Sequence, residues 1–538
     1  MQIVFLALSL YSVLANGLQI TLPAGSALKS KARPVAPDLV SFSIEQDRWE
    51  EWVGSTSRNE FFYNALVNLR ELAGRPPTIR VGGRSQDVTH LKTNMQGSEV
   101  LFANSTPSVP YPEAVYMRVG PSFFLSAKFL PEDTRVIHGL NFASADDLRG
   151  LFHLAAIANA FTAPSIKNAR VTLEAIEVGN EPDRYGRLDA RMPTYDGTQY
   201  VKEWNTWAGN VLAVKQLYPE FLFSYWGASL SVNSSHDPTG WTPEALFGQG
   251  LLDSPAGKRL KTVSQHHYSI DGCAEGPTDI LNLMKKANVR KSLEPFKSSL
   301  KATQEKGLEY VLGEVGSVSC HGATGVSDTA GAALWALDYA LHSASMGISR
   351  VFFHQGIGYK SNFLQPVFLN RSPIDGSDLP SPLSPHINPQ YYAAIIAAEA
   401  IGSSNGSVEI LELSIEDNRV SAYVFLKGGL PTRAVLINSQ PYFASESGDG
   451  VFQTRPFVRV SLEIEGMPED AQFMMKRLSI QYTDATAGLT WGGFTFETDD
   501  AFPSGEEEIE CIDFGEEFEL YATEAVLLYL QEVEGAET

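Results

Sequence analysis

The stretches IEVGNEP, residues 176–182, and YVLGEVG, residues 310–316, carry the strongest fold signal in this chain. Each is an apolar run of β-forming residues that leads to a glutamate, Glu181 in the first and Glu314 in the second. A carboxylate at the end of a buried strand is costly unless a site uses it. Because the parallel strands of one barrel all end on the same side, the two glutamates are predicted to meet at one rim.

The region around these stretches alternates β-type runs with helical stretches, which is typical of βα units and a parallel sheet. Eight strands are predicted, over Leu39–Glu45, Thr78–Gly82, Arg135–Asn141, Leu173–Val178, Leu222–Gly227, Thr262–Tyr268, Tyr310–Gly313 and Arg350–His354. Helices are predicted over Glu60–Leu72, Asp146–Ala160, Tyr200–Tyr218, Ile280–Thr303, Asp328–Met346 and Pro389–Ile401. Eight such units predict an α/β fold, a (β/α)8 TIM barrel over residues 38–402.

Beyond residue 402 the pattern changes to β-formers separated by Gly, Pro and Asp turns. The runs predict a C-terminal antiparallel β-sandwich over residues 403–538, with strands at Val408–Leu413, Arg419–Leu426, Arg433–Asn438, Phe457–Glu463, Gln472–Gln481 and Phe518–Leu530. The stretch Leu18–Pro23 shows the same period-two alternation. Residues 18–37 are therefore expected to form an N-terminal strand and connector packed on the sandwich.

Residues 1–17 are predicted to be a secretory signal peptide, because an apolar stretch too short to span a bilayer precedes small residues near Ala15. No Lys or Arg precedes that stretch, so a buried N-terminal strand remains the alternative. Four N-x-Ser/Thr sequons also favour a secreted, extracellular glycoprotein, although such tripeptides arise by chance as well; they are Asn104, Asn233, Asn370 and Asn405.

The charge balance narrows the range of partners. A formal net charge of -22 at pH 7 disfavours nucleic acid, anionic membrane surfaces and densely sulfated polysaccharides. The one basic run, from Lys285 to Lys291, falls in a predicted amphipathic helix and is interpreted as a solvated face. No Cys/His spacing indicates a zinc site and no Gly-rich phosphate loop follows a strand, so neither a metal nor a cofactor is expected.

Two strand-end carboxylates are suited to acid/base and nucleophilic chemistry. Asn180 is placed to hydrogen-bond a substrate hydroxyl beside the reacting carbon, and Pro182 fixes the chain as it leaves the strand. For a lone Asn-Glu-Pro, a turn or helix cap would be the favoured explanation. The second strand-end glutamate favours a site over a cap.

At this point the chain resembles a known family. The motifs VGNEP (178–182) and LGEVG (312–316), with IRVGG (79–83), QHHY (265–268) and YDGTQY (195–200), are similar to retaining glycoside hydrolases of the large (β/α)8 clan. More narrowly, they resemble glycoside hydrolase family 79, which contains β-glucuronidases and heparanase. The resemblance covers nearly the whole mature chain and includes the C-terminal β-sandwich.

The resemblance implies roles for the two glutamates. Glu181 is expected to be the general acid/base and Glu314 the nucleophile of a double displacement, with their carboxyl groups about 5 to 5.5 Å apart. Tyr268 would donate a hydrogen bond that keeps Glu314 ionised. A barrel-layer aromatic with a satisfied hydroxyl is an equal interpretation of Tyr268.

The resemblance also implies that the loop after Glu314, residues 316–323, receives the C6 carboxylate of glucuronic acid through backbone N–H groups. Gly322 belongs to this turn, and His321 would add charge at acidic pH or simply be solvated. A disulfide between Cys273 and Cys320 would fix the loop and leave Cys511 over. Further sugar contacts are expected, each also explained as a loop cap or rim residue, at Glu45, Gln46, Asp87 and Tyr359.

The resulting expectation is a secreted retaining exo-β-glucuronidase that removes terminal β-linked glucuronic acid, with or without a 4-O-methyl group, from glycans. The acidic balance disfavours heparanase-like endo-cleavage of sulfated chains. Two alternatives stay open: another retaining β-glycosidase of the clan that takes a neutral sugar, and a catalytically silent carbohydrate-binding protein on this scaffold. The exact glycan and its linkage, the pH optimum and the oligomeric state depend on loops that the sequence does not fix.

Overall fold

The structure is a computed structural model that describes residues 18–22, 29–144, 146–231, 240–273, 278–403, 407–444, 454–464 and 471–530. The expected signal peptide and the sequons at Asn233 and Asn405 lie outside these residues. The sequon asparagines Asn104 and Asn370 are both exposed. None of the helices in the described part of the chain is long and apolar enough to cross a membrane.

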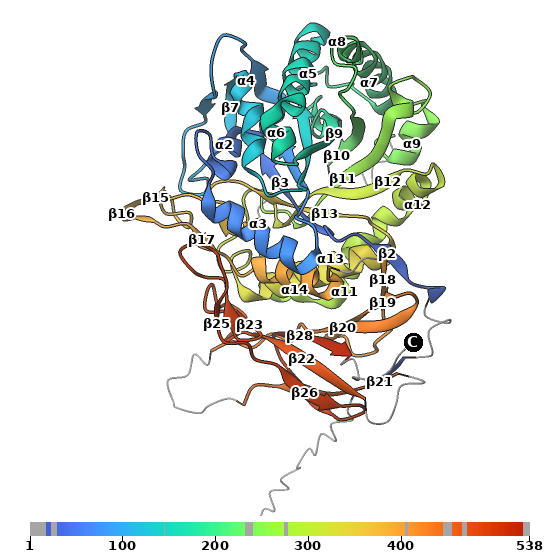
Figure 1. Cartoon of the computed structure of the whole chain (residues 1–538), viewed down its shortest axis with the longest axis vertical. Helices are drawn as coiled ribbons and strands as arrows, with labels where there is room; N and C mark the ends of the chain where they lie inside the picture. The colour runs from blue at the N-terminus through green and yellow to red at the C-terminus, as the bar shows by residue number, and fades with distance from the viewer. Residues whose placement is uncertain are drawn as a thin grey trace, which may run out of the picture.

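Eight parallel strands close into a barrel, as the sequence predicts (Figure 1). In chain order they are β3 (Val40–Glu45), β4 (Ile79–Gly82), β8 (Arg135–Leu140), β9 (Thr172–Val178), β10 (Ser224–Leu230), β11 (Leu260–Ile270), β12 (Glu309–Val318) and β13 (Val351–Gln355). β11 and β12 run further than predicted because they stay paired beyond the rim, from His266 opposite Glu314 to Ile270 opposite Val318. Both strands therefore carry site residues past the barrel mouth.

Helices cover the outside of the barrel with their apolar faces inward. The larger ones are α3 (Glu60–Ala73), α5 (Asp147–Thr162), α7 (Gly197–Val211), α13 (Ala330–Met346) and α14 (Tyr391–Ile401). Shorter helices complete the set: α2 (Trp49–Val53), α4 (Pro121–Leu125), α6 (Pro164–Asn168), α8 (Val214–Leu217), α9 (Pro243–Gly248), α10 (Ile280–Met284), α11 (Lys286–Leu293) and α12 (Lys297–Glu305). The long helix predicted over 280–303 is broken into three, and Pro295 lies between the last two, where it removes a backbone donor.

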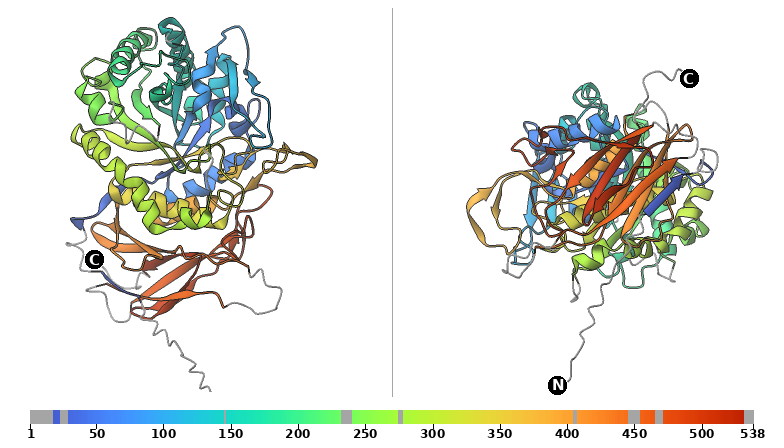
Figure 2. Two further views of the ribbon diagram at one scale, coloured as in Figure 1. Left: turned by 180° about the vertical axis from the view of Figure 1, so that it is seen from behind. Right: turned by 90° about the horizontal axis from the view of Figure 1, so that it is seen from below.

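The C-terminal part forms two sheets that pack on each other below the barrel (Figure 2). The larger sheet contains β2 (Arg33–Val35), β18 (Val408–Glu412), β19 (Val420–Lys427), β20 (Leu430–Asn438), β28 (Glu524–Leu530), β22 (Gln472–Ser479), β26 (Glu510–Asp513), β23 (Thr490–Trp491), β24 (Phe494–Thr495) and β25 (Ser504–Gly505). The smaller one joins β1 (Leu18–Leu22), β21 (Phe457–Ile464) and β27 (Phe518–Tyr521). β1 pairs in parallel with β21, which places the N-terminal strand on the sandwich.

The barrel contacts this sandwich through α13 and α14, which lie between the two parts (Figure 1). The basic run from Lys285 to Lys291 contributes to this interface, so the interpretation as a solvated face is wrong for two of its members. The Arg290 guanidinium binds Asp338 of α13 and Glu412 of β18, and Lys286 Nζ donates to two backbone carbonyls of the sandwich. These two cations are turned toward the protein because carboxylates and carbonyls from distant parts of the sequence bind them.

Between β4 and β8 the chain makes a small extra sheet that the sequence did not reveal. It consists of β5 (Thr89–Leu91), β6 (Ser98–Phe102) and β7 (Ala114–Val119), with β7 in the middle. After β13 come the short pairs β14 (Leu364–Gln365) with β17 (His386–Ile387), and β15 (Leu369–Arg371) with β16 (Asp378–Leu383). These elements follow the carboxyl ends of barrel strands and so surround the rim where a site is expected.

Candidate active site

Glu181 and Glu314 come together at the barrel rim. One carboxylate oxygen of each, together with a ring nitrogen of His266, lies within 4.8 Å of the others. His266 Nδ1 is 3.1 Å from Glu181 Oε1 and 3.8 Å from Glu314 Oε2. The two glutamate side chains keep 13% and 10% of their surface exposed. Both are mostly buried yet reachable, and their separation suits two groups acting on one sugar ring.

The backbone at Glu181 is held in an unusual conformation. Its φ is 47°, in the left-handed region, and its N–H donates to the Ser229 carbonyl of β10 at 2.8 Å. A non-glycine residue in this region costs on the order of 1–3 kcal/mol and persists only where its surroundings fix it. Pro182 then opens a 3-10 turn over Pro182–Arg184. The strained backbone aims the carboxylate at the position opposite Glu314.

Arg80 of β4 is the central cation of the site, and the sequence reasoning did not identify it. Its fully buried guanidinium binds both oxygens of Glu177, at 2.8 and 2.9 Å. It also donates to Glu314 Oε2 at 3.0 Å and to Asn180 Oδ1 at 2.7 Å. A charged residue inside the apolar run 79–82 was the available signal, because a buried arginine requires partners. One side chain thus joins the Glu181 loop to Glu314 and leaves Asn180 Nδ2 as the donor for a ligand.

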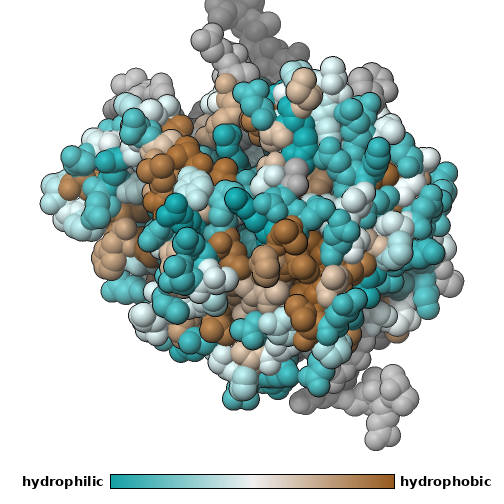
Figure 3. Space-filling model, turned by 90° about the horizontal axis from the view of Figure 1, so that it is seen from above, coloured by the Kyte–Doolittle hydropathy of each residue, from teal (hydrophilic) through white to brown (hydrophobic). Residues whose placement is uncertain are grey.

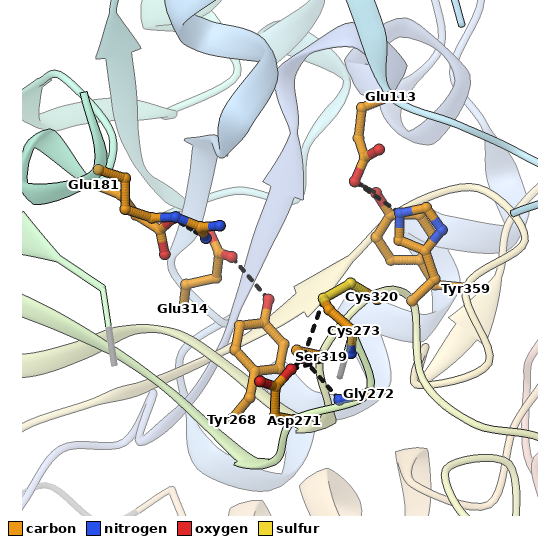
Figure 4. Close-up of a disulfide and its surroundings, with 12 residues drawn as sticks. Glu113, Glu181, Tyr268, Asp271, Gly272, Cys273, Glu314, Ser319, Cys320 and Tyr359 are labelled. Atoms are coloured by element: carbon orange, nitrogen blue, oxygen red, sulfur yellow. Dashed lines mark hydrogen bonds and ion pairs between the residues drawn. A yellow bond between two sulfur atoms is a disulfide. The ribbon is translucent and has the colours of Figure 1, made fainter. Parts of the chain in front are cut away.

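Glu314 is surrounded by donors and positive charges. Tyr268 Oη donates to its Oε1 at 2.7 Å (Figure 4), and His354 Nδ1 lies 3.8 Å from its Oε2. Burial acts to raise the pKa of Glu314, but His354, His266, Arg80 and the Tyr268 hydrogen bond outweigh burial and hold this pKa far below its usual value. The Glu314 carboxylate is therefore ionised and oriented, as a nucleophile must be.

Glu181 has a different environment. Burial raises its pKa, whereas the hydrogen bond and charge of His266 and the charge of Arg184 lower it below the ordinary value, with the charge of Glu314 working upward. Arg184 Nη1 donates to Glu181 Oε2 at 2.9 Å from an exposed position. Glu181 thus depends on a histidine and a solvent-screened cation, while Glu314 has a permanent buried guanidinium. Both pKa values are thus lowered, but the cations that favour ionisation are more deeply buried at Glu314 than at Glu181.

The same three groups, Glu181, His266 and Glu314, have the donor set of a small metal site. Arg80 and Tyr268 already donate to the two oxygens of Glu314, however, and a cation would have to displace one of them against the charge of the guanidinium. The arrangement is suited to proton transfer and nucleophilic attack rather than to holding a metal.

Glu45 and Gln46, expected to bind ring hydroxyls, are turned toward the protein instead. Glu45 accepts from the backbone N–H groups of Arg84 and Ser85 and lies 3.3 Å from His354 Nε2. Gln46 is fully buried and donates to the Gly139 carbonyl at 3.1 Å. A polar group at a strand end satisfies its hydrogen bonds with whichever loop lies above it. Glu45 consequently positions His354, which in turn faces Glu314.

Asp87 has a similar supporting place. Its carboxylate accepts from the backbone N–H groups of Phe142, Ala143 and Asn180 and from Tyr185 Oη. Burial raises the pKa of Asp87 to about 7 against the effect of these donors. The carboxylate fixes the backbone of Asn180 and the loop after β8 rather than facing an open site.

The loop after β12 is fastened by a disulfide between Cys273 and Cys320 (Figure 4), while Cys511 lies on exposed β26. Cys320, His321 and Gly322 have φ values of 57°, 75° and 83°, all left-handed. Their backbone N–H groups make no hydrogen bond to another described residue. Successive N–H groups in such a turn form a concavity that binds anions.

His321 and Tyr359 form a stacked pair behind this turn, with ring centroids 4.0 Å apart. Both bind Glu113, at 2.7 Å from His321 Nε2 and 3.1 Å from Tyr359 Oη (Figure 4). Burial acts to raise the pKa of Glu113, but the hydrogen bond and charge of His321 lower it to about 2. Tyr359 is only 7% exposed, so it is a wall of the site and not a side chain free to close over a sugar. No sequence pattern marked Glu113, which comes from the segment just before β7.

Hydrolysis of a glycosidic bond requires two carboxyl groups that reach the same sugar ring, and this barrel rim supplies them. The fold and the site therefore define a glycoside hydrolase. Residues 422–527 match the family model described as the glycosyl hydrolase family 79 C-terminal beta domain. The C-terminal part of this chain is therefore similar to that of glycoside hydrolase family 79.

Two relatives are similar in sequence to most of this chain, and one solved structure shares its fold. A β-glucuronidase of Neurospora crassa is 28% identical over 507 residues, which cover 86% of this chain and 85% of that protein. A β-glucuronidase of Aspergillus niger is 27% identical over 498 residues, 89% and 86% of the two chains. The crystal structure of a 4-O-α-L-rhamnosyl-β-D-glucuronidase from Fusarium oxysporum shares the fold, with a TM-score of 0.74, 22% identity and coverage of 95% and 100%.

Proposed function

We propose that this chain is a secreted retaining exo-β-glucuronidase that releases terminal β-linked glucuronic acid from glycans by double displacement. The observation that carries the proposal is the carboxylate pair within 4.8 Å at the rim. Retaining glycosidases place their two carboxyl groups about 5 to 5.5 Å apart, whereas inverting ones leave room for a water between them. The two relatives named β-glucuronidase support the sugar specificity.

In the first step Glu314 attacks the anomeric carbon while Glu181 protonates the departing glycosidic oxygen, which gives a glycosyl ester on Glu314. The negative charge of Glu314 acts to raise the pKa of Glu181, although the net shift of this pKa is downward. The Glu314 charge disappears in the ester, so the pKa of Glu181 falls further and the ionised Glu181 accepts a proton from water in the second step. Water then attacks the ester and releases the sugar with its original anomeric configuration.

The turn over residues 320–322 supports recognition of the sugar carboxylate. It lies on the Glu314 side of the site, because His321 stacks on Tyr359, whose ring is 5.9 Å from that of His354, the neighbour of Glu314. The Glu113 carboxylate repels a second anion, and its pairing with His321 offsets that repulsion. The backbone N–H groups of the turn are then the donors for the C6 carboxylate. Whether a 4-O-methyl group on the sugar is accepted depends on the space beside Tyr359, which forms the wall of the site.

Secretion is supported by three features. Residues 1–17 have the length and apolarity of a signal peptide. A disulfide links Cys273 and Cys320, as is usual in oxidising compartments. The sequons at Asn104 and Asn370 are exposed and accessible for glycan attachment.

The test compares a chromogenic β-glucuronide with the matching β-glucoside, and follows the first-formed sugar by proton NMR. The proposal expects turnover of the glucuronide, little of the glucoside, and a β-configured product before mutarotation. An α-configured first product contradicts the double displacement. Preference for the glucoside would establish the neutral-sugar alternative, and glucuronate binding without turnover of either substrate would establish the silent binder.

A further inference from the structure

A cavity of about 600 Å³ lies between the small sheet and α5, apart from the carboxylate pair. Five basic side chains line it: His90, Lys92, Arg118, Arg149 and His153. They come from β5, the turn after it, β7 and α5, so the fold assembles a basic pocket that no run of the sequence shows. Among the described residues that line the cavity there is no aspartate or glutamate. This cluster of cations has the sign opposite to the formal net charge of the chain, which is -22.

The cations of this basic pocket are only partly compensated. Arg118 is 3.8 Å from Glu99 and Arg149 is 2.9 Å from Asp146, and all four of these side chains are substantially exposed. Such surface pairs contribute little and are easily exchanged. Burial and then the charges of Arg149 and Arg118 lower the pKa of His90, so both guanidiniums lie close enough to act on the same ring.

The floor of the pocket carries a second, independent sign of a ligand. His153 of α5 lines the cavity, is 96% buried, and its Nε2 has no hydrogen-bond partner. Buried polar atoms normally have a hydrogen-bond partner, so an unpaired one indicates a partner such as a bound ligand. A ligand with an acceptor or donor group at the floor would hydrogen-bond to this nitrogen, while the negative charge of the ligand stays near the basic side chains at the rim.

The aromatic lining indicates that the ligand carries a ring. Phe152 of α5 is 61% exposed, and Tyr116 of β7 packs against His90 with ring centroids 5.1 Å apart. Both side chains line the same cavity. Figure 3 shows the end of the molecule that lies away from the C-terminal sheets, where hydrophilic side chains are interrupted by apolar areas. Exposed aromatic faces beside a few polar groups form a typical site for a small amphipathic ligand.

We propose that this basic pocket binds the carboxylate or sulfate group of an acidic sugar. The ligand is either a second acidic unit of the glycan being cleaved or a free acidic monosaccharide. The loop after β8 connects the pocket to the catalytic site: Asn141 lines the pocket, and the next two residues, Phe142 and Ala143, donate to Asp87, which also holds Asn180. An occupant therefore contacts the loop that supports the catalytic acid/base segment.

The first experiment measures binding without turnover. Inorganic sulfate and free glucuronate are titrated calorimetrically into the full-length protein, its triple variant K92Q/R118Q/R149Q, and a control variant K297Q/K301Q/K306Q that removes three exposed lysines on and just after α12. The wild type is expected to bind sulfate with a Kd no weaker than about 10 mM. The pocket variant should bind at least about tenfold more weakly, as expected for loss of charge-assisted hydrogen bonds, and the control should match wild type.

The second experiment identifies the source of the acidic group. KM and kcat are compared for an aryl β-glucuronide and for a β-glucuronide linked to an acidic sugar. A roughly tenfold higher KM in the pocket variant for the acidic-sugar substrate alone, with kcat unchanged, assigns the pocket to the cleaved glycan. Unchanged KM values together with lost sulfate and glucuronate binding assign it to a free monosaccharide. Equal sulfate binding by wild type and pocket variant, or none by wild type, overturns the inference whatever the activity of the enzyme.

Discussion

Replacing Arg80 by lysine tests the claim that one buried guanidinium organises the catalytic pair. Lysine keeps the charge but loses the planar fork that binds Glu177 at 2.8 and 2.9 Å and reaches Asn180 and Glu314. Losing two charge-assisted hydrogen bonds at about 1.5 kcal/mol each predicts about 3 kcal/mol less stability. If about 2 kcal/mol of this lost stabilisation also raises the free energy of the transition state, kcat/KM falls about 30-fold.

The matched control is Arg350→Lys. Arg350 is an equally buried arginine immediately before β13, and it binds Glu174 and Glu309 at the opposite end of the barrel. This variant is expected to lose similar stability while its kcat/KM stays within about twofold of wild type. Urea unfolding and steady-state kinetics on an aryl β-glucuronide measure both quantities. Equal kinetic losses in the two variants would refute the role given to Arg80, because they would show that activity follows stability alone.

Three further predictions concern the catalytic pair, the barrel interface and the disulfide. Glu314→Gln is expected to abolish turnover of every substrate, whereas Glu181→Ala should spare substrates with good leaving groups and recover part of its rate with azide. Glu412→Gln should lower the free energy of unfolding by about 2 kcal/mol at pH 7, because the His342 and Arg290 partners outweigh burial and lower the Glu412 pKa from 4.5 to about 2. Cys273→Ser should raise KM for glucuronides with little change in kcat, since the turn over residues 320–322 loses its tether.

For each of these three predictions, a specific result would contradict the reasoning. Equal, small losses in the two glutamate variants would contradict their assigned roles. The depressed pKa of Glu412 means that its stabilising contribution is complete above pH 4.5 and is lost as pH falls toward about 2, so the difference from wild type must vanish in acid. Denaturation across pH 2 to 7 checks this, and a constant difference would argue against the ion pair. Unchanged KM in the cysteine variant would separate the disulfide from carboxylate binding.

The sequence predicted the barrel well because each strand is a local apolar run and the eight runs repeat with helices between them. It located Glu181 and Glu314 for the same reason, since a charge at the end of such a run is visible in one short window. Arg80 and Glu177 were also visible as charges inside apolar strands. Their pairing was not, because it joins β4 to β9 across the barrel interior.

The other omissions share this cause. Glu113 comes from an irregular segment and gains meaning only when His321 and Tyr359 stack beside it. Glu45 looked like a sugar ligand because it ends a strand, but the 84–85 loop supplies its partners. The basic run of α11 looked solvated because its acceptors lie far away in the sequence, Asp338 on α13 and others more than a hundred residues later. Long-range partners decide whether a strand-end or surface charge faces a ligand or the protein.

In the proposed double displacement, the charges around Glu314 also explain how the site passes between the free enzyme and the glycosyl ester. In the free enzyme burial lowers the pKa of His354, but the charge of Glu314 and the hydrogen bond to Glu45 raise it above its ordinary value. Formation of the glycosyl ester removes the Glu314 charge, so His354 loses its main reason to hold a proton, while Arg80 remains neutralised by Glu177. If His354 then loses its proton, the buried Glu45 carboxylate keeps the hydrogen bonds from the backbone N–H groups of Arg84 and Ser85. Arg80 is a permanent cation with Glu177 as its counter-ion, whereas His354 is a titratable cation that faces Glu314. Together they limit the change in net charge of the site when the covalent bond forms.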